Sequence, residues 1–247
     1  MYGDAMRQPA TVWDSDSAGR IGGTPFRWVS SDYHLHKTTA DEIVVLKPKG
    51  FFDAYKDWTP KRILEVGIFE GGSTLILADM FPEAEIIAID IREANPAVQD
   101  HLERLGFADR VKLHYEVSQS DGKALKAILG DFKPDLVIDD ASHVYRHSVA
   151  TFNVVFPRVT PRGRYVIEDW GWAHWSNWVG HPIYLKGKAL STLVLELVMA
   201  AASRPDVIAS VHVDSAMAVV TKANHKGKIG PLSDMVRLND GRTWSGP

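Results

Sequence analysis

The sequence has no cysteine among its 247 residues. A disulfide framework and a thiolate zinc site are therefore excluded. Long apolar runs are missing too, since none approaches the ~18 residues of a membrane-spanning helix, and the first residues lack the apolar core of a signal peptide. The net charge of -3 gives no sign of nucleic acid binding. We therefore expect a soluble, cytoplasmic protein that binds neither membranes nor nucleic acids.

What is present suffices for one large domain, because 45% of the residues are hydrophobic. Residues 1–38 are polar with scattered aromatic side chains, and we predict an N-terminal arm outside the core, followed by a domain over residues 39–247. Residues 39–57 are predicted to be helical, with a break or kink at Pro48 and Gly50. That helix would cover a ligand site, flank a sheet or contact another subunit, and we expect a homo-oligomer.

From residue 62 onward, strand-like and helix-like segments alternate regularly. The predicted strands are RILEV, EIIAID, VKLHYEV, DLVIDD and RYVIE, and the predicted helices cover residues 73–80, 96–105, 122–129, 147–159 and 189–202. This alternation indicates a parallel sheet with right-handed crossovers. Two β-rich runs at 207–213 and 216–223 predict a final antiparallel hairpin. The fold class is therefore α/β, with a Rossmann-like, mostly parallel sheet of seven strands that ends in an antiparallel hairpin.

A glycine-rich turn follows the first of these strands, in the sequence RILEVGIFEGGS from Arg62 to Ser73. Its glycines allow a sharp turn and close approach of a ligand to the backbone. Ser73 is predicted to cap the next helix, whose N-terminal amides favour anionic groups. Asp90 ends the next strand, where a carboxylate can accept hydrogen bonds from both ribose hydroxyls of a nucleoside ligand.

The turn also distinguishes between two cofactors. A dinucleotide site requires GxGxxG, and Phe69 stands where the second glycine would be. The pattern E-x-G-x-x-x-G-G instead resembles the first motif of methyltransferases that depend on S-adenosyl-L-methionine (SAM). An ordinary strand–glycine–helix turn of an α/β protein is the alternative.

Carboxylates gather after the fourth and fifth predicted strands. Asp139 and Asp140 follow one strand, and Glu168 and Asp169 follow the other. Ligands bind at the carboxyl ends of strands in open α/β sheets, so these acids are predicted to converge there. Clustered carboxylates repel unless a cation lies between them, which favours Mg²⁺, with Mn²⁺ or Ca²⁺ as alternatives. Solvated loop acids or helix caps are the other interpretation.

A histidine lies on the same loop as the first acidic pair. His143 is three residues after Asp140, and an imidazole suits proton abstraction near neutral pH. A structural hydrogen bond is the alternative role for it. His147, His174 and His181 are rival candidates, and proximity to the proposed metal favours His143.

Together, DDASH, the later Glu-Asp pair and the glycine turn resemble a known family. They look like the metal-dependent O-methyltransferases that act on sugars of natural products, the macrolide deoxysugar enzymes and the related cephalosporin hydroxylase family. The resemblance covers about residues 40–225. It implies a glycosylated small-molecule acceptor, SAM and Mg²⁺ as cofactors, and His143 as general base. The implied metal ligands are Asp140, Glu168 and Asp169.

The resemblance extends to the segment SQSD, which in the family contacts the adenosyl part of SAM. The residues predicted to bind the cofactor are Glu65, Gly67, Ser73, Asp90, Gln119, Ser120, Asp121 and Asp139. Four tryptophans between residues 170 and 178 are interpreted as a substrate wall or, alternatively, as packing of a lid or a subunit interface.

Three other functions stay open at this point. A catechol-type O-methyltransferase would use a similar sheet and acid cluster, with lysine as its usual base. A partner in an oxidative modification fits the cephalosporin hydroxylase resemblance. A scaffold that binds SAM without turnover is the third, although its catalytic acids and His143 are all present.

Overall fold

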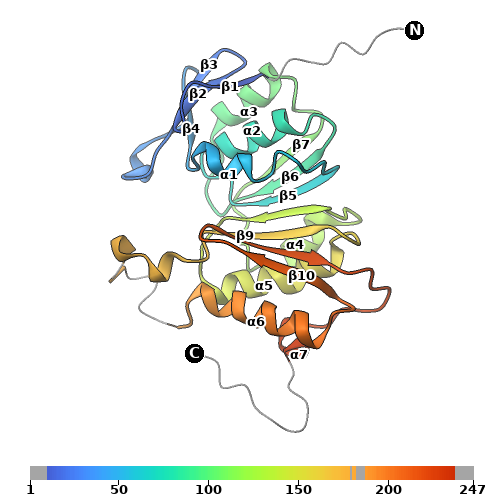
Figure 1. Ribbon diagram of the computed structural model, residues 1–247. Helices are drawn as coiled ribbons and strands as arrows, with labels where there is room; N and C mark the ends of the chain where they lie inside the picture. Colours follow the sequence, from blue (N-terminus) through green and yellow to red (C-terminus); the bar gives the residue numbers. More distant parts are fainter. Residues whose placement is uncertain (1–9, 179, 182–186, 237–247) are drawn as a thin grey trace, which may run out of the picture.

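The computed structural model describes residues 10–178, 180–181 and 187–236. These residues form a large sheet between two layers of helices, with a small N-terminal sheet beside one layer (Figure 1). The large sheet contains seven strands in the order β10-β11-β9-β8-β5-β6-β7. Its strands are β5 (Arg62–Val66), β6 (Glu85–Ile89), β7 (Val111–His114), β8 (Leu136–Asp139), β9 (Arg164–Glu168), β10 (Ile208–Val213) and β11 (Met217–Lys222).

Five strands of this sheet, β5 to β9, run parallel, and β10 and β11 form an antiparallel hairpin that joins β9. This is the α/β fold predicted from the sequence. The strand order places the carboxyl ends of β5, β8 and β9 side by side, with Val66 opposite Asp139 and Asp139 opposite Ile167. Parallel strands bring their carboxyl ends to one edge, so the glycine turn and both acidic pairs lie at that edge.

Helices cover both faces of the large sheet. The helices are α1 (Lys49–Asp53), α2 (Gly72–Met80), α3 (Pro96–Arg104), α4 (Gly122–Leu129), α5 (Tyr145–Val155), α6 (Leu190–Ser203) and α7 (Leu232–Met235). Apolar side chains of α4 to α7 pack on one face, and those of α1 to α3 pack on the other. Because successive strand residues point to opposite faces, Leu64 and Ile63 belong to different apolar cores. No helix in the described residues is long and apolar enough to cross a membrane.

The N-terminal part differs from its prediction. Residues expected as an arm form β1 (Thr11–Trp13), β2 (Ala18–Ile21) and β3 (Thr24–Trp28), which pair with β4 (Ile43–Val45) in a second sheet. Ile21 and Phe26 are buried in the apolar core on the α1–α3 face, so this segment is not outside the core. Strand β3 pairs with β4 across residue 38, and a domain boundary at that residue stays a prediction.

The helix expected over residues 39–57 is also corrected. Ile43–Val45 is a strand, and only Lys49–Asp53 is helical. Three consecutive β-branched residues suit a pleated surface, and the parallel pairing with β3 supplies their backbone partners. Pro48 immediately precedes the short helix, where its missing N–H costs nothing.

Candidate active site

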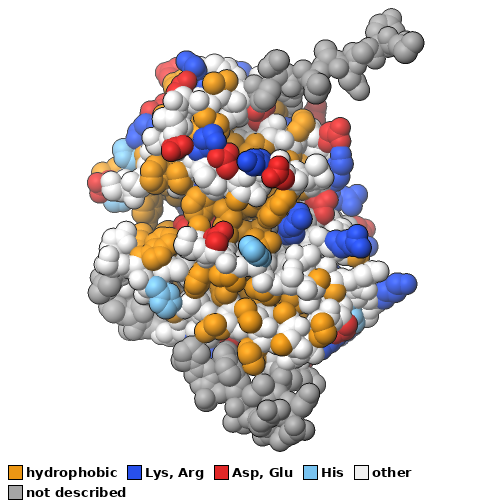
Figure 2. Space-filling model, in the orientation of Figure 1, with side chains coloured by type: hydrophobic (Ala, Val, Ile, Leu, Met, Phe, Trp, Pro, Cys, Tyr) orange, Lys and Arg blue, Asp and Glu red, His pale blue; other side chains and the backbone are white. Residues whose placement is uncertain are grey.

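A cavity of about 930 Å³ opens at the carboxyl edge of the large sheet. Its lining includes the glycine turn, the loops that follow β8 and β9, and residues of the N-terminal segment such as Trp28 and Tyr33. Apolar side chains gather across the middle of this view of the molecule, below the N-terminal sheet (Figure 2). A volume in this range with a few convergent polar groups is typical of a site for a cofactor or small ligand.

Two positions of the glycine turn have backbone conformations that favour glycine. Gly67 has a φ of +111°, and a Cβ there would lie 2.1 Å from the backbone oxygen of Asp140. The turn after β5 therefore packs directly against the loop after β8, which only a residue without a side chain permits. Gly71 adopts the left-handed conformation and is the N-cap of α2. Ser73 thus lies inside the first turn and is not the cap that the sequence predicted.

Ser73 and Glu65 interact with each other. The Ser73 hydroxyl donates to Glu65 Oε1 at 2.6 Å, and the Thr74 hydroxyl donates to Glu65 Oε2. Glu65 is fully buried and does not line the cavity, whereas Ser73 does. Burial raises the pKa of Glu65 to about 7, against the lowering effect of Lys47 and the two hydroxyls. Glu65 therefore anchors the turn from beneath.

Asp90 lines the cavity just after β6 and shapes the glycine turn. Its Oδ2 accepts hydrogen bonds from the amides of Ile68 and Phe69, at 2.8 and 2.7 Å, and its Oδ1 accepts one from Arg92. Oδ2 thereby uses both of its lone pairs, whereas Oδ1 retains one that can accept a further hydrogen bond. The position therefore leaves Asp90 able to accept a ribose hydroxyl while it fixes the turn.

The segment after β7 contains three of the predicted cofactor residues, and one of them, Gln119, lines the cavity. Gln119 donates to Asp139 Oδ1 and accepts from the amide of Ser142, so it joins this segment to the loop after β8. Asp139 is buried, also accepts from Tyr165, and does not line the cavity. Asp121 caps α4 through the amides of Lys123 and Ala124.

Ser120 completes the predicted set after β7. It is exposed, its hydroxyl lies 3.0 Å from that of Ser118, and it does not line the cavity. Four predicted cofactor residues thus lie on the cavity wall (Gly67, Ser73, Asp90 and Gln119), and four do not (Glu65, Ser120, Asp121 and Asp139).

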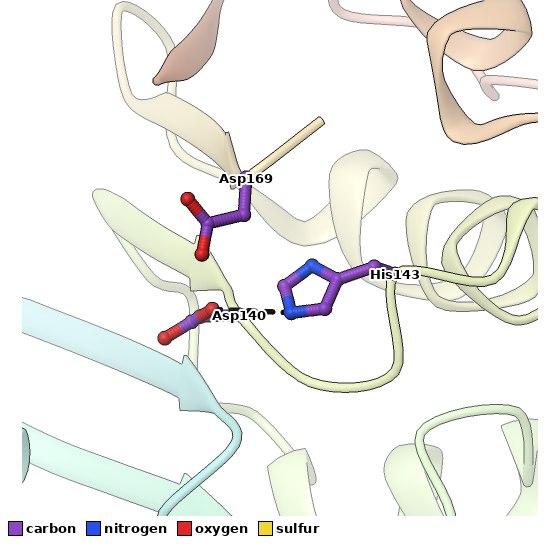
Figure 3. A group of neighbouring side chains, drawn as sticks. All are labelled: Asp140, His143 and Asp169. Atoms are coloured by element: carbon purple, nitrogen blue, oxygen red, sulfur yellow. Dashed lines mark ion pairs between the residues drawn. The ribbon is translucent and has the colours of Figure 1, made fainter. Parts of the chain in front are cut away.

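Two carboxylates and an imidazole meet at the cavity edge. Asp140 and His143 come from the loop after β8, Asp169 follows β9, and their side chains point toward one another (Figure 3). One ligand atom from each lies within 4.8 Å of the others, and His143 Nε2 is 3.6 Å from Asp140 Oδ1. Carboxylate oxygens at this spacing fit a divalent cation such as Mg²⁺.

Negative charge accumulates in this group. Burial, together with the charges of Asp140 and Glu168, raises the pKa of Asp169 to about 7, although Lys47 acts against the rise. Burial likewise raises the pKa of Glu168 to about 7, although Lys47 acts against the rise. Like charges held together in a partly desolvated site favour either protonation or a bound cation. The donor set and its charge therefore both suit a divalent metal.

Glu168 lies apart from the group that it was predicted to join. It is fully buried, does not line the cavity, and accepts a hydrogen bond from the Tyr55 hydroxyl at Oε1. Its Oε2 lies 2.6 Å from Lys47 Nζ, and the same ammonium lies 3.1 Å from Asp140 Oδ2. Strand alternation explains the separation, because Glu168 points to the face covered by the N-terminal segment.

Lys47 is a functional candidate that the sequence did not reveal. Burial opposes its charge, but the combined field of Asp140, Glu168 and Glu65 raises its pKa above the ordinary value, so it stays protonated. It is 5% exposed and lines the cavity. A lysine at the end of the apolar run IVVL was the one available signal, and nothing local identified its partners.

His143 is held in a fixed place. It is 8% exposed, has a φ of +52°, and its ring lies 4.2 Å from that of Trp172. Burial lowers its pKa to about 4, although Glu168 acts in the opposite direction. The imidazole is therefore neutral at pH 7 and able to accept a proton.

The rival histidines occupy other surroundings. His147 and His181 line the cavity, and His147 Nδ1 lies 3.2 Å from the Ser142 hydroxyl. His174 is exposed and contacts the Ser191 hydroxyl. None of the three belongs to the group of Asp140 and Asp169.

The tryptophan segment after β9 forms part of the cavity wall. Trp172, Trp175 and Trp178 line the cavity, and Trp172 stacks on Trp178 with ring centroids 4.3 Å apart. Trp170 instead packs against the core on the α4–α7 face and donates to the carbonyl of Asp214. Three of the four tryptophans are thus placed to contact a ligand in the cavity.

Comparison with known proteins agrees with this geometry. A methyltransferase domain family matches residues 64–170. Mycinamicin VI 2''-O-methyltransferase of Micromonospora griseorubida is 32% identical over 53% of this chain and 33% of that protein. The 8-demethyl-8-(2-methoxy-alpha-L-rhamnosyl)-tetracenomycin-C 3'-O-methyltransferase of Streptomyces olivaceus is 34% identical over 44% of this chain and 28% of that protein.

A solved structure is similar as well. MycE, a methyltransferase of the mycinamycin biosynthetic pathway in complex with Mg, SAH and mycinamycin VI, has a TM-score of 0.53 and 28% identity. The match covers 73% of this chain and 50% of MycE. The chain thus spans about a third of the length of these curated relatives and half of that solved protein.

The matched residues coincide with the site. They extend from β5 through the glycine turn to the acidic pair after β9, so they include Asp140, His143 and Asp169. The resemblance to sugar O-methyltransferases that the sequence indicated is confirmed. Residues 64–170 therefore match a methyltransferase domain family, and the fold is that of class I methyltransferases.

Proposed function

We propose that this protein transfers the methyl group of SAM to a sugar hydroxyl of a glycosylated natural product, with Mg²⁺ as the metal. The observation that carries the proposal is the meeting of Asp140, His143 and Asp169 beside the glycine turn. Relatives with this domain are named for methylating sugar positions of macrolides and tetracenomycins. The chain spans only part of those relatives, so its acceptor is inferred from the site.

The cofactor would lie along the glycine turn. Gly67 lines the cavity and lets the turn pack against the loop after β8, and Asp90 Oδ1 offers a carboxylate lone pair at the cavity wall. Phe69 is in the cavity wall and occupies the position that a dinucleotide motif reserves for glycine. These features support SAM in preference to NAD.

The metal would be held by Asp140 and Asp169, whose oxygens lie at the cavity edge. When bound, a divalent cation lowers the pKa of a coordinated hydroxyl and orients it. The sequence prediction also includes Glu168 as a ligand, and that role stays a prediction.

His143 would act as the base. Its neutral imidazole takes the proton of the acceptor hydroxyl, and the hydroxyl oxygen attacks the methyl carbon of SAM. The C–S bond breaks as the C–O bond forms, and S-adenosylhomocysteine leaves. Trp172 holds the imidazole ring against rotation, which keeps it oriented toward the acceptor.

Lys47 does not supply the base that a catechol-type enzyme would use. It is the one lysine in the described cavity lining, and the surrounding carboxylates keep it protonated. No feature of the described site favours the oxidative alternative. A cytoplasmic location and a homo-oligomeric state stay predictions of the sequence.

The function is tested by transfer of a labelled methyl group from SAM to glycosylated macrolide and aromatic polyketide acceptors, with catechols as the comparison. We expect transfer to a sugar hydroxyl, its loss with EDTA and its return with Mg²⁺. Full transfer after exhaustive chelation would contradict the metal role, and transfer to catechols alone would contradict the sugar acceptor.

Replacing the base is the first specific prediction. His143→Ala should lower kcat by roughly 10²–10⁴-fold, the usual contribution of a positioned base, while SAM binding is retained. Because the neutral form is active and burial lowers the pKa to about 4, wild-type activity should fall only as the pH drops toward that value. If the mutant keeps a near-wild-type kcat and the same acid limb in its pH–rate profile, His143 is not the base. His147 or His181 would then be the candidates.

A further inference from the structure

The N-terminal segment is joined to the glycine turn through Thr38 and Glu70. The Thr38 hydroxyl donates to the Glu70 carbonyl at 2.6 Å, and the Thr38 amide donates to Glu70 Oε2 at 3.1 Å. Asn95 donates to the same Oε2 at 2.6 Å and to the Thr38 carbonyl at 3.0 Å. Thr38 and Glu70 are both buried. These hydrogen bonds therefore fix the place of residue 38 relative to the turn.

Arg92 connects this junction to the cavity wall. Its Nη2 lies 3.1 Å from Glu70 Oε1, and its guanidinium carbon lies 4.4 Å from the centroid of the Phe69 ring. Phe69 and Arg92 line the cavity, whereas Glu70 does not. The Phe69 amide also donates to Asp90 Oδ2. The Phe69 ring is thus held beside the carboxylate that we propose for the ribose.

Tyr33 is the N-terminal side chain that meets this wall. It precedes Thr38 in the connection between β3 and β4, and its ring centroid lies 5.8 Å from that of Phe69. Tyr33 lines the cavity and is 42% exposed, and Ile91, the neighbour of Asp90, lines it and is 70% exposed. Large apolar side chains left exposed at a cavity are typical of a surface that a ligand covers.

We propose that Tyr33 contacts the nucleoside part of SAM, and that Thr38 is the positioning residue that holds Tyr33 there through Glu70. The N-terminal segment then supplies one wall of the cofactor site, although the residues matched by the methyltransferase family begin at residue 64. The inference rests on the proposed function, because it assigns further residues to the same SAM site.

The test of the contact measures SAM binding to the full chain by calorimetry, without metal or acceptor. Tyr33→Ala should raise the Kd for SAM about tenfold, the loss expected for one aromatic contact. Tyr33→Phe keeps the ring, so its Kd should stay within about twofold of wild type. If Tyr33 contacts the acceptor instead, the Kd for SAM stays unchanged in Tyr33→Ala, and this result overturns the proposal.

The positioning role is tested with two matched substitutions. Thr38→Val leaves the buried Glu70 carbonyl without its donor, and the Kd for SAM should rise about fivefold. Thr24→Val is the control, because the buried Thr24 hydroxyl accepts from Arg104 and so also joins the N-terminal sheet to a helix of the large sheet. Thr24 does not line the cavity, so the Kd for SAM should stay within about twofold. Equal weakening by both substitutions overturns the positioning role.

A double variant separates positioning from a general loss of stability. If Thr38 acts through Tyr33, adding Thr38→Val to Tyr33→Ala should change the Kd by less than about twofold. Independent effects would multiply, and that outcome overturns the positioning role. A wild-type protein that binds SAM and a Tyr33→Ala variant with the same Kd overturn the inference alone. A wild-type protein that binds no SAM overturns the proposed function and this inference with it.

Discussion

The ends of strands β5 and β9 each bury a glutamate, and the partners of one are near in sequence whereas those of the other are distant. Glu65 and Glu168 are both fully buried, and both point to the sheet face covered by α1 to α3. Glu65 accepts hydrogen bonds from two hydroxyls in the helix that follows it. Glu168 is compensated by Lys47 and Tyr55, which lie more than a hundred residues earlier in the chain.

This difference shows what each strand end depends on. The β5 end is a local hydrogen-bonded unit, since the helix that follows the turn supplies both hydroxyls that donate to Glu65. The β9 end is completed only when the N-terminal sheet is in place, because Lys47 follows β4 and Tyr55 follows α1. A local unit is readable from a short stretch of sequence, and a long-range pair is not.

Removing the ammonium group of Lys47 should cause the largest loss of stability, at the β9 end. Lys47→Met leaves Glu168 buried without its charged partner, and we expect a loss of about 3–5 kcal/mol in the free energy of unfolding. Urea denaturation measures this loss. The double variant with Glu168→Gln should recover most of it, and a single variant as stable as wild type would show that the pair contributes little.

At the β5 end, a substitution of Asp90 tests the residue proposed to bind the cofactor. Asp90→Ala removes the acceptor of the Ile68 and Phe69 amides, so the turn loses its shape and a ribose hydroxyl loses a partner. We expect SAM affinity to fall by about 1–3 kcal/mol, as for hydrogen bonds to a charged group. Calorimetry measures the change, and unchanged SAM affinity with unchanged Mn²⁺ affinity would contradict the ribose assignment.

The last comparison concerns the pH dependence of stability that Glu65 contributes. Burial raises its pKa to about 7 in the folded protein, above the ordinary value of 4.5. The folded state therefore binds this proton more tightly than the unfolded state, and the resulting stability, complete below about pH 4.5, is lost as the pH rises through 7. Glu65→Gln should show a smaller decrease of Tm between pH 5 and pH 8 than wild type. Parallel Tm curves for the two proteins would contradict a titration of Glu65 near pH 7 in the folded state.

The sequence predicted the parts of the fold that local patterns specify. Strands β5 and β9 were predicted at the residues where they occur, and the final hairpin was predicted within one residue at each end. The fold class was predicted from the alternation of strand-like and helix-like segments. The rule for strand ends predicted that Asp139, Asp140, Glu168 and Asp169 converge, and of these Asp140 and Asp169 meet at the cavity, together with His143. These features depend on short apolar runs and on the rule that parallel strands end at one edge.

The errors concern residues whose partners are distant or unexpected. Ile43–Val45 became a strand because β3 pairs with it, and no local signal in residues 39–57 indicated that pairing. Ser73 was predicted as a helix cap from its residue type, but Gly71 takes that place and Ser73 donates to Glu65. Lys47 was missed because burial and ion pairing of a lysine are decided by tertiary structure.

The origin of Lys47 and Tyr55 has a consequence for recombination between homologous proteins. A chimera that joins residues 64–170 of this chain to a foreign N-terminal segment would inherit Glu168 without the two side chains that compensate it. Successful exchange must therefore transfer residues 47, 55 and 168 as one set. Covariation among these three positions would show that the N-terminal segment is inherited together with the β9 end.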